Sequence, residues 1–203
     1  MNEMGKIMGR VLLGRRIGIV RTLLVAVLLW GSAGVAEAQD LPTPRGPVVL
    51  TVSGGIEHTN RGALDALERR ESLFKYHEIA FERAAQFDLG ALERLGMHEI
   101  TVSHPGWPKA FTFEGPLLQD VLTAVGATGR VVRILALDGY AAEIPISEIQ
   151  DRPFIVAVKR EGRYLGIGDQ GPAWVVTPPA FDQKPGNEQG SEWVWAAFYI
   201  AIE

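Results

Sequence analysis

The sequence is dominated by short apolar runs that are rich in β-branched residues and separated by turn-forming residues. Runs of roughly four to eight such residues, bounded by Gly, Pro, Asp or Ser, are typical of β-strands. A few helical patterns lie between them, so the chain is constrained to an α+β fold. We expect strands at residues 48–54, 99–103, 131–137, 141–146, 153–159, 163–167, 172–178 and 192–202.

Helical spacing of apolar residues predicts three helices. Across residues 64–87 apolar side chains recur every three or four positions with Arg and Glu between them, which places His77 in a packed helix face. Asp88 is positioned to cap a short helix that ends at Gly96. Residues 115–127 give the clearest pattern, because a proline suits the first turn and a glycine ends the apolar repeat.

The N-terminal residues have the pattern of a secretory signal peptide. A basic region precedes the apolar stretch TLLVAVLLWGSAGVA, and Ala36-Glu37-Ala38 resembles a small-residue cleavage site. The alternative is a membrane anchor, for which the run is short against a bilayer core about 30 Å thick. We therefore expect export to the periplasm with loss of residues 1–38, a flexible lead-in at 39–47 and one domain at 48–203.

Composition narrows the chemistry that this chain can perform. The formal net charge is −4, and no basic cluster of the kind that nucleic acid requires is visible. The chain has no cysteine, so it forms no disulfide and offers no thiolate to a metal. We expect no nucleic-acid partner and no membrane insertion after cleavage.

The stretch SHPGW is the most unusual feature, because a strand-like run ends directly in a loop of Pro, Gly and Trp. None of the four histidines has close metal-ligand spacing with another. Ser103 and His104 invite a hydrolase interpretation, but there is no G-x-S-x-G motif, and neighbouring strand residues face opposite sides. We predict no catalytic residue and no metal ligand.

Several turn segments could contribute to a binding site for a flat heterocycle. Trp107 could stack on such a ring or cover the core edge, and Asp138-Gly139-Tyr140 could face a ligand or form a simple turn. The glycines around Asp169 and Gln170 would let the backbone approach a ligand closely. The predicted ligand-binding residues are Ser103, His104, Trp107, Asp138, Tyr140, Asp169 and Gln170.

The order of the motifs over residues 48–182 carries more information than any one motif. LTVSG, EITVSHPGW, FEGPLLQDVL, ALDGYAAEIPISEI, REGRYLGIGDQGP and WVVTPP follow one another along the chain. This order resembles the molybdopterin-binding oxidoreductase domain of the sulfite oxidase type. The resemblance implies an α+β fold with a mixed β core, and a pterin-bound molybdenum in those members that are enzymes.

The sequence departs from this family at the position of its metal ligand. Counting back from Gly115, Trp107 corresponds to a family aromatic and Ser103 to the cysteine that holds molybdenum. A serine hydroxyl has a much higher pKa than a thiol and is a poorer soft ligand. The arginine-rich contacts expected for a pyranopterin phosphate are also missing.

A subset of the family is closer still: small, exported, cysteine-free proteins that bind free pterins without metal. The resemblance implies a pterin ligand and signalling to the periplasmic part of a membrane-bound cyclic-di-GMP-metabolising enzyme. Two other functions stay open: a molybdopterin-dependent oxidoreductase that lacks the usual cysteine, and an exported domain that keeps the fold as a protein-interaction surface.

Overall fold

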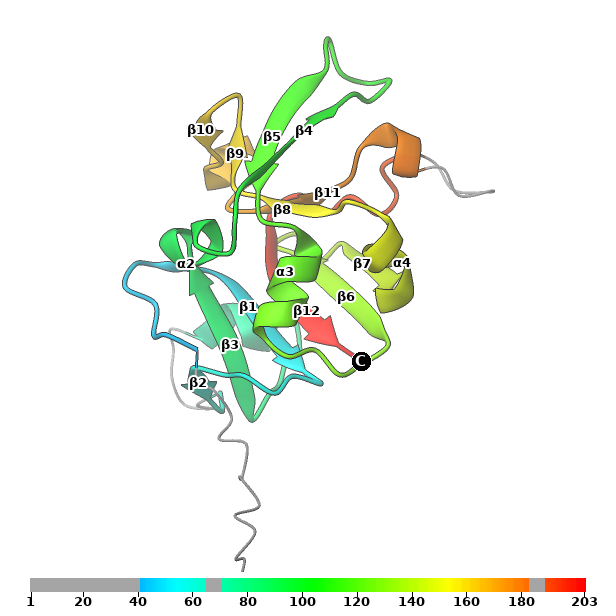
Figure 1. The fold of residues 1–203 in the computed structure, drawn as a ribbon. Coiled ribbons are helices and arrows are strands. Elements are labelled where there is room, and N and C mark those ends of the chain that lie inside the picture. The colour runs from blue at the N-terminus through cyan, green and yellow to red at the C-terminus, as the bar shows by residue number, and fades with distance from the viewer. Residues whose placement is uncertain (1–40, 65–70, 183–188) are drawn as a thin grey trace, which may run out of the picture. The chain divides into compact units, whose positions relative to one another are not determined.

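The computed structural model of the protein describes residues 41–64, 71–182 and 189–203, all within one compact unit that spans residues 36–203 (Figure 1). The predicted signal peptide and the first residues of the predicted lead-in lie outside the described residues. No helix in the described part of the chain is long and apolar enough to cross a membrane.

A six-stranded mixed sheet forms the centre of the unit. β1 and β12 run parallel, and the other neighbouring strands are antiparallel. Across the sheet the order is β2 (Arg61–Gly62), β3 (Arg83–Asp88), β1 (Val48–Gly54), β12 (Ala197–Ile202), β6 (Val131–Ala136) and β7 (Ala141–Pro145).

Alternating side chains give this sheet two different faces. Residues such as Leu50, Val52, Val132, Ile134 and Ile200 are fully buried in the main hydrophobic core. Helix α3 (Leu118–Ala124) packs against that face through three of its apolar residues (Figure 1). This is the period-two pattern expected of strands whose core side is covered by a helix.

A second group of strands carries the predicted SHPGW loop. A four-stranded sheet has the order β10 (Arg163–Tyr164), β9 (Lys159–Arg160), β5 (Phe111–Gly115) and β4 (His98–Val102). Beside it, β8 (Ile155–Ala157) pairs with β11 (Trp174–Val176). These strands share a smaller core of Val102, Phe113, Ile155, Ala157, Leu165, Trp174, Val176 and Trp193.

The remaining helices are short. They are α1 (Ser72–Tyr76), α2 (Leu89–Glu93), α4 (Ile146–Asp151) and the 3-10 turns η2 (Ile167–Asp169) and η3 (Pro179–Phe181). The α+β fold class with a mixed sheet is therefore the one predicted from the sequence.

The prediction of one long helix over residues 64–87 is wrong. Residues 65–70 lie outside the described residues, but the rest of the range forms a short helix and a strand. Helix α1 ends at Tyr76, and β3 occupies the last part of the range. β3 pairs with β1 on one side and β2 on the other, and Ala84 and Ala85 are both fully buried. Tertiary pairing overrides the helical spacing here, because consecutive buried residues suit an inner strand covered on both faces.

Other local predictions are confirmed. Asp88 caps α2, and its carboxylate accepts a hydrogen bond of 2.6 Å from the Ala91 N–H. A hairpin joins β9 to β10 through Glu161 and Gly162, which both have positive φ, as a two-residue type I′ turn requires. The predicted strand at 153–159 is instead divided between β8 and β9, which belong to different sheets.

The Asp88 side chain ties the segment just before β1 to helix α2. Besides capping the helix, its carboxylate accepts hydrogen bonds from the backbone N–H groups of Arg45 and Gly46. The hydrogen bonds from Gly46 and Ala91 lower the pKa of Asp88, and they outweigh the opposing effect of burial. A lowered pKa means that this carboxylate stabilises the fold above its ordinary pKa and loses that effect as the pH falls through its folded value.

We predict that Asp88→Asn lowers the free energy of unfolding at pH 7 by about 2 kcal/mol, because an amide cannot accept all three hydrogen bonds as well as a carboxylate. Urea denaturation measures the change, and the wild type and the variant should converge as the pH falls through the lowered pKa of Asp88. Asp151→Asn is the control, because Asp151 is exposed at the end of α4. A gap that stays constant with pH would contradict this role for the Asp88 charge.

Candidate functional site

Five of the seven predicted ligand-binding residues line one cavity of about 510 Å³. These are His104, Trp107, Asp138, Tyr140 and Gln170. They come from three segments that lie far apart in the sequence and meet beside β11. Six further residues complete the lining: Trp174, Gln189, Gly190, Ser191, Trp193 and Trp195.

Local backbone geometry places the polar residues at this cavity. In the turn between β6 and β7, Gly139 has a φ of 91°, and the Asp138 carboxylate accepts a hydrogen bond of 2.9 Å from the Tyr140 N–H. Gln170 ends η2 in the left-handed region, with a φ of 67°, and its carbonyl accepts a hydrogen bond from Ala196. Each residue sits in a turn that only a few residue types adopt easily.

The wall segment, residues 189–195, forms one side of the cavity. Its Val194 exchanges two backbone hydrogen bonds with Val175 of β11, each 2.9 Å long. Since alternate residues of an extended chain face the same side, Trp193 and Trp195 flank Val194 on the side of the cavity. This pairing brings three of the four cavity tryptophans together.

Trp107 is the centre of an aromatic cluster and is only partly exposed. Its ring lies 5.7 Å from the His104 ring, 5.7 Å from Trp174 and 5.8 Å from Trp193, measured between centroids. Offset and edge contacts at such distances add to the energy of burial. Trp195, by contrast, is 38% exposed, so it offers the more accessible indole face.

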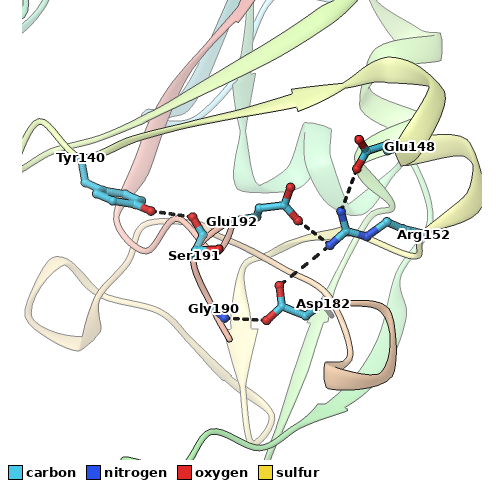
Figure 2. A network of polar contacts seen from close by, with 7 residues as sticks. All are labelled: Tyr140, Glu148, Arg152, Asp182, Gly190, Ser191 and Glu192. Atoms are coloured by element: carbon cyan, nitrogen blue, oxygen red, sulfur yellow. Dashed lines mark hydrogen bonds and ion pairs between the residues drawn. The ribbon is translucent and has the colours of Figure 1, made fainter. Parts of the chain in front are cut away.

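Two hydrogen bonds hold the wall segment across the cavity. The Tyr140 hydroxyl donates a bond of 2.6 Å to the Ser191 carbonyl (Figure 2). The Gln189 side-chain amide donates a bond of 2.7 Å to the Ser103 carbonyl. The wall segment is thereby tied both to the β6–β7 turn and to the loop that follows β4.

A buried charged network anchors the same segment from behind. Figure 2 shows the Arg152 guanidinium, which hydrogen-bonds Glu148 at 3.2 Å and forms ion pairs with Glu192 at 2.5 Å and Asp182 at 3.9 Å. The other Asp182 oxygen accepts a hydrogen bond of 2.5 Å from the Gly190 N–H. Three carboxylates therefore share one cation at the base of the wall.

Burial raises the pKa of Asp182, and the nearby Glu192 carboxylate raises it further. The Gly190 hydrogen bond and the Arg152 charge act in the opposite direction but do not overcome burial. Keeping Asp182 ionised in the folded protein therefore costs free energy. That cost makes the wall segment depend strongly on the single guanidinium that all three acids share.

Ser103 and Asp169 lie outside the 510 Å³ cavity. Ser103 is exposed and takes part in the wall contact through its backbone carbonyl. Asp169 lines a separate, smaller cavity of about 220 Å³, where its carboxylate is 3.9 Å from Arg160. The structure thus brings five of the predicted residues together and places two elsewhere.

A larger cavity of about 600 Å³ lies on the opposite face of the main sheet. It is lined by Ser53, Arg133 and Tyr199, which alternate with core residues along their strands, and by residues 77–83. The Ser53 and Tyr199 hydroxyls are 2.5 Å apart. None of the predicted binding residues lines it, and its tryptophan-free wall offers less to a flat ring than the smaller cavity does.

Sequence reasoning missed three tryptophans and Gln189. The sequence predicts that Trp174 belongs to an apolar strand and that Trp193 and Trp195 belong to a buried strand at 192–202. The strand β12 begins only at Ala197, after Ala196 adopts a φ of 51°. The dense Trp-x-Trp pattern next to a loop rich in Gly and Pro was the available signal, because aromatic enrichment beside loops is common in ligand sites.

No protein-family model matches this sequence, and no curated protein matches it. Among solved structures, the sulfane dehydrogenase SoxCD from Paracoccus pantotrophus is similar, with a TM-score of 0.51 and 15% sequence identity. The match covers 75% of this chain and 37% of that chain, so this protein spans well under half of its structural neighbour. SoxCD has the sulfite oxidase fold. The fold of this chain is sulfite-oxidase-like.

We predict that Arg152→Met lowers the free energy of unfolding by about 3–5 kcal/mol, because the buried carboxylates of Asp182 and Glu192 would lose the cation that they share. Urea denaturation at pH 7 measures this change. Arg133→Met is the matched control, since Arg133 is half exposed and 4.0 Å from Glu143, a pair worth about 1 kcal/mol or less. Equal, small effects of the two substitutions would show that the network does not anchor the wall.

Proposed function

We propose that this protein binds a free pterin, without metal, in the cavity of about 510 Å³. The observation that carries the proposal is the meeting of four tryptophans with Asp138, Gln170 and Gln189 around one space. Small-molecule sites are mostly apolar and aromatic, with a few polar groups that fix orientation. A pterin matches this description, because it is a flat ring with polar donors and acceptors along its edge.

The partly exposed indole of Trp195 is the primary stacking surface in this proposal, and Trp107 supports it from the cluster beneath. Aromatic stacking on a base-like ring contributes about 1–3 kcal/mol per contact. Asp138 supplies a carboxylate that can accept hydrogen bonds from the amino group of the pterin. The volume is of the size usual for small-molecule pockets.

The fold also raises the question of a molybdenum cofactor, and the residues do not fit one. The chain has no cysteine, and the serine at the predicted ligand position is exposed outside the cavity. In the described ranges no three His, Asp or Glu side chains are grouped to hold a metal. No described Lys or Arg lines this cavity to receive a cofactor phosphate. The oxidoreductase alternative therefore has support from the fold but none from the site.

The sulfite-oxidase-like fold supports a pterin as the ligand, since that family binds molybdopterin, which is itself a pterin. The signal-peptide pattern of residues 1–38 supports a place in the periplasm. We propose that the pterin-loaded protein signals from there to a membrane-bound enzyme that makes or degrades cyclic di-GMP. The wall segment, which contacts both the ligand cavity and the outer surface, is the element able to report occupancy.

We predict that Trp195→Ala weakens pterin binding about ten-fold or more through the loss of one stacking face. Fluorescence titration of the purified protein with a pterin measures the dissociation constant. Trp107→Ala should weaken binding too, but it should also lower the free energy of unfolding by about 3 kcal/mol, because Trp107 is the hub of the cluster. Tyr76→Ala is the control, since Tyr76 is 80% exposed and does not line this cavity.

Metal analysis of protein purified from the periplasm decides between a metal-free pterin and a molybdenum cofactor as the ligand. A fluorescent pterin released on denaturation, with no stoichiometric molybdenum, supports the proposal. Stoichiometric molybdenum would overturn it in favour of the oxidoreductase. Binding that is unchanged in Trp195→Ala and in Trp107→Ala would overturn the stacking arrangement.

A further inference from the structure

Two hydrogen-bond donors in the cavity wall have no acceptor in the described part of the chain. The indole nitrogens of Trp174 and Trp193 are closed to solvent and without a hydrogen-bond partner. Both side chains line the proposed pterin cavity, and they are only 4% and 5% exposed. Each is therefore a deeply buried polar side chain at the surface of the same space.

Such donors are unusual in a folded protein. Most buried polar groups are hydrogen-bonded, and a buried indole N–H normally finds a partner. A donor left unpaired costs free energy that the wall would avoid if either residue were phenylalanine. An indole N–H can only donate, so the missing partner must be an acceptor.

We infer that the Trp174 and Trp193 N–H groups donate to acceptor atoms on the edge of the bound ring, and so select an oxo-substituted heterocycle. This inference rests on the proposed function, because it assigns the orientation of the ligand in the same cavity. On one edge of the ring a pterin offers two acceptors, the 4-oxo group and the ring nitrogen N5. An analogue with an amino group in place of the oxo group presents a donor to the indoles instead.

The other polar groups around the cavity complement this orientation. Asp138 is exposed at the β6–β7 turn and can accept from the ligand, while the two indoles lie deeper and can only donate. The exposed Asp138 carboxylate would accept a hydrogen bond from the 2-amino group of the pterin. The two buried indole N–H groups would donate to the 4-oxo group of the same pyrimidine ring. The described lining has no lysine or arginine, so the cavity selects an uncharged acceptor rather than a phosphate or carboxylate.

The indole nitrogens are reached by movement of the wall rather than through an open channel. Trp193 belongs to the wall segment, which Tyr140 holds through its bond to the Ser191 carbonyl. Trp174 lies in β11 and contacts Trp107 and Phe113 edge-on. Ligand entry therefore shifts the wall and changes the surroundings of the Trp193 ring, and tryptophan fluorescence reports that change.

The test compares three probes on the wild-type protein at pH 7.5: pterin (2-amino-4-oxo), lumazine (2,4-dioxo) and 2,4-diaminopteridine. Pterin and lumazine keep the oxo acceptor at position 4, whereas the diamino compound replaces it with a donor. We expect the diamino compound to bind at least about ten-fold more weakly than pterin, because its 4-amino group presents a donor where the buried indole N–H groups need an acceptor. Lumazine should bind better than the diamino compound.

The variants Trp174→Phe and Trp193→Phe keep an aromatic ring and remove the N–H. Each should reduce the preference for pterin over 2,4-diaminopteridine several-fold, with thermal unfolding and near-UV circular dichroism confirming the fold. If a variant does not fold, the wild-type comparison of the three probes decides alone.

The outcomes separate this inference from the proposed function. Equal binding of pterin and 2,4-diaminopteridine by the wild type overturns the inference and leaves a pterin-binding protein. A preference that survives unchanged in both folded Phe variants also overturns it. Failure of all three probes to bind removes the proposed function and the inference together.

Discussion

The strand β12 is the element on which the rest of the structure depends. It pairs with β1 on one side and β6 on the other, so the last described residues of the chain lie in the middle of the main sheet. The residues just before it must then pass beside β11, where Val194 pairs with Val175. The wall segment is therefore positioned by the packing of the sheet, and the cavity follows from where β12 starts.

The buried charges serve the same segment. Arg152 comes from the end of α4 and meets Glu192 of the wall segment and Asp182, which precedes the undescribed residues 183–188 (Figure 2). Charges this deep are costly, and replacing a whole buried ion network by apolar side chains of similar size can leave a protein as stable, whereas removing one partner destabilises it. The Arg152 guanidinium does, however, specify which carboxylates come together. It thereby sets the position of Trp193 and Trp195 relative to β11.

The sequence predicted the fold class and most strands, because alternation and turn residues are local signals. Five of the residues that it proposed for ligand binding line one cavity, and three of these, Asp138, Tyr140 and Gln170, lie in turns that are visible in the sequence. Prediction from the sequence failed where tertiary contacts determine the local structure. The residues of β3 have helical spacing, but they form a strand because they fill an inner position in the sheet. Trp193 has the composition of a strand and becomes part of a cavity wall only because β12 begins four residues later.

A fold by itself does not specify a function, so the function of this protein has to be argued from the residues of its site. The fold is sulfite-oxidase-like, but the chain has no cysteine, and the described residues around the cavity include no metal-binding cluster and no lysine or arginine. The described lining of the cavity is mainly aromatic, and two of its indole N–H donors have no partner among the described residues. These groups can recognise the edge of a flat ring, and for that reason we propose that the cavity binds a pterin.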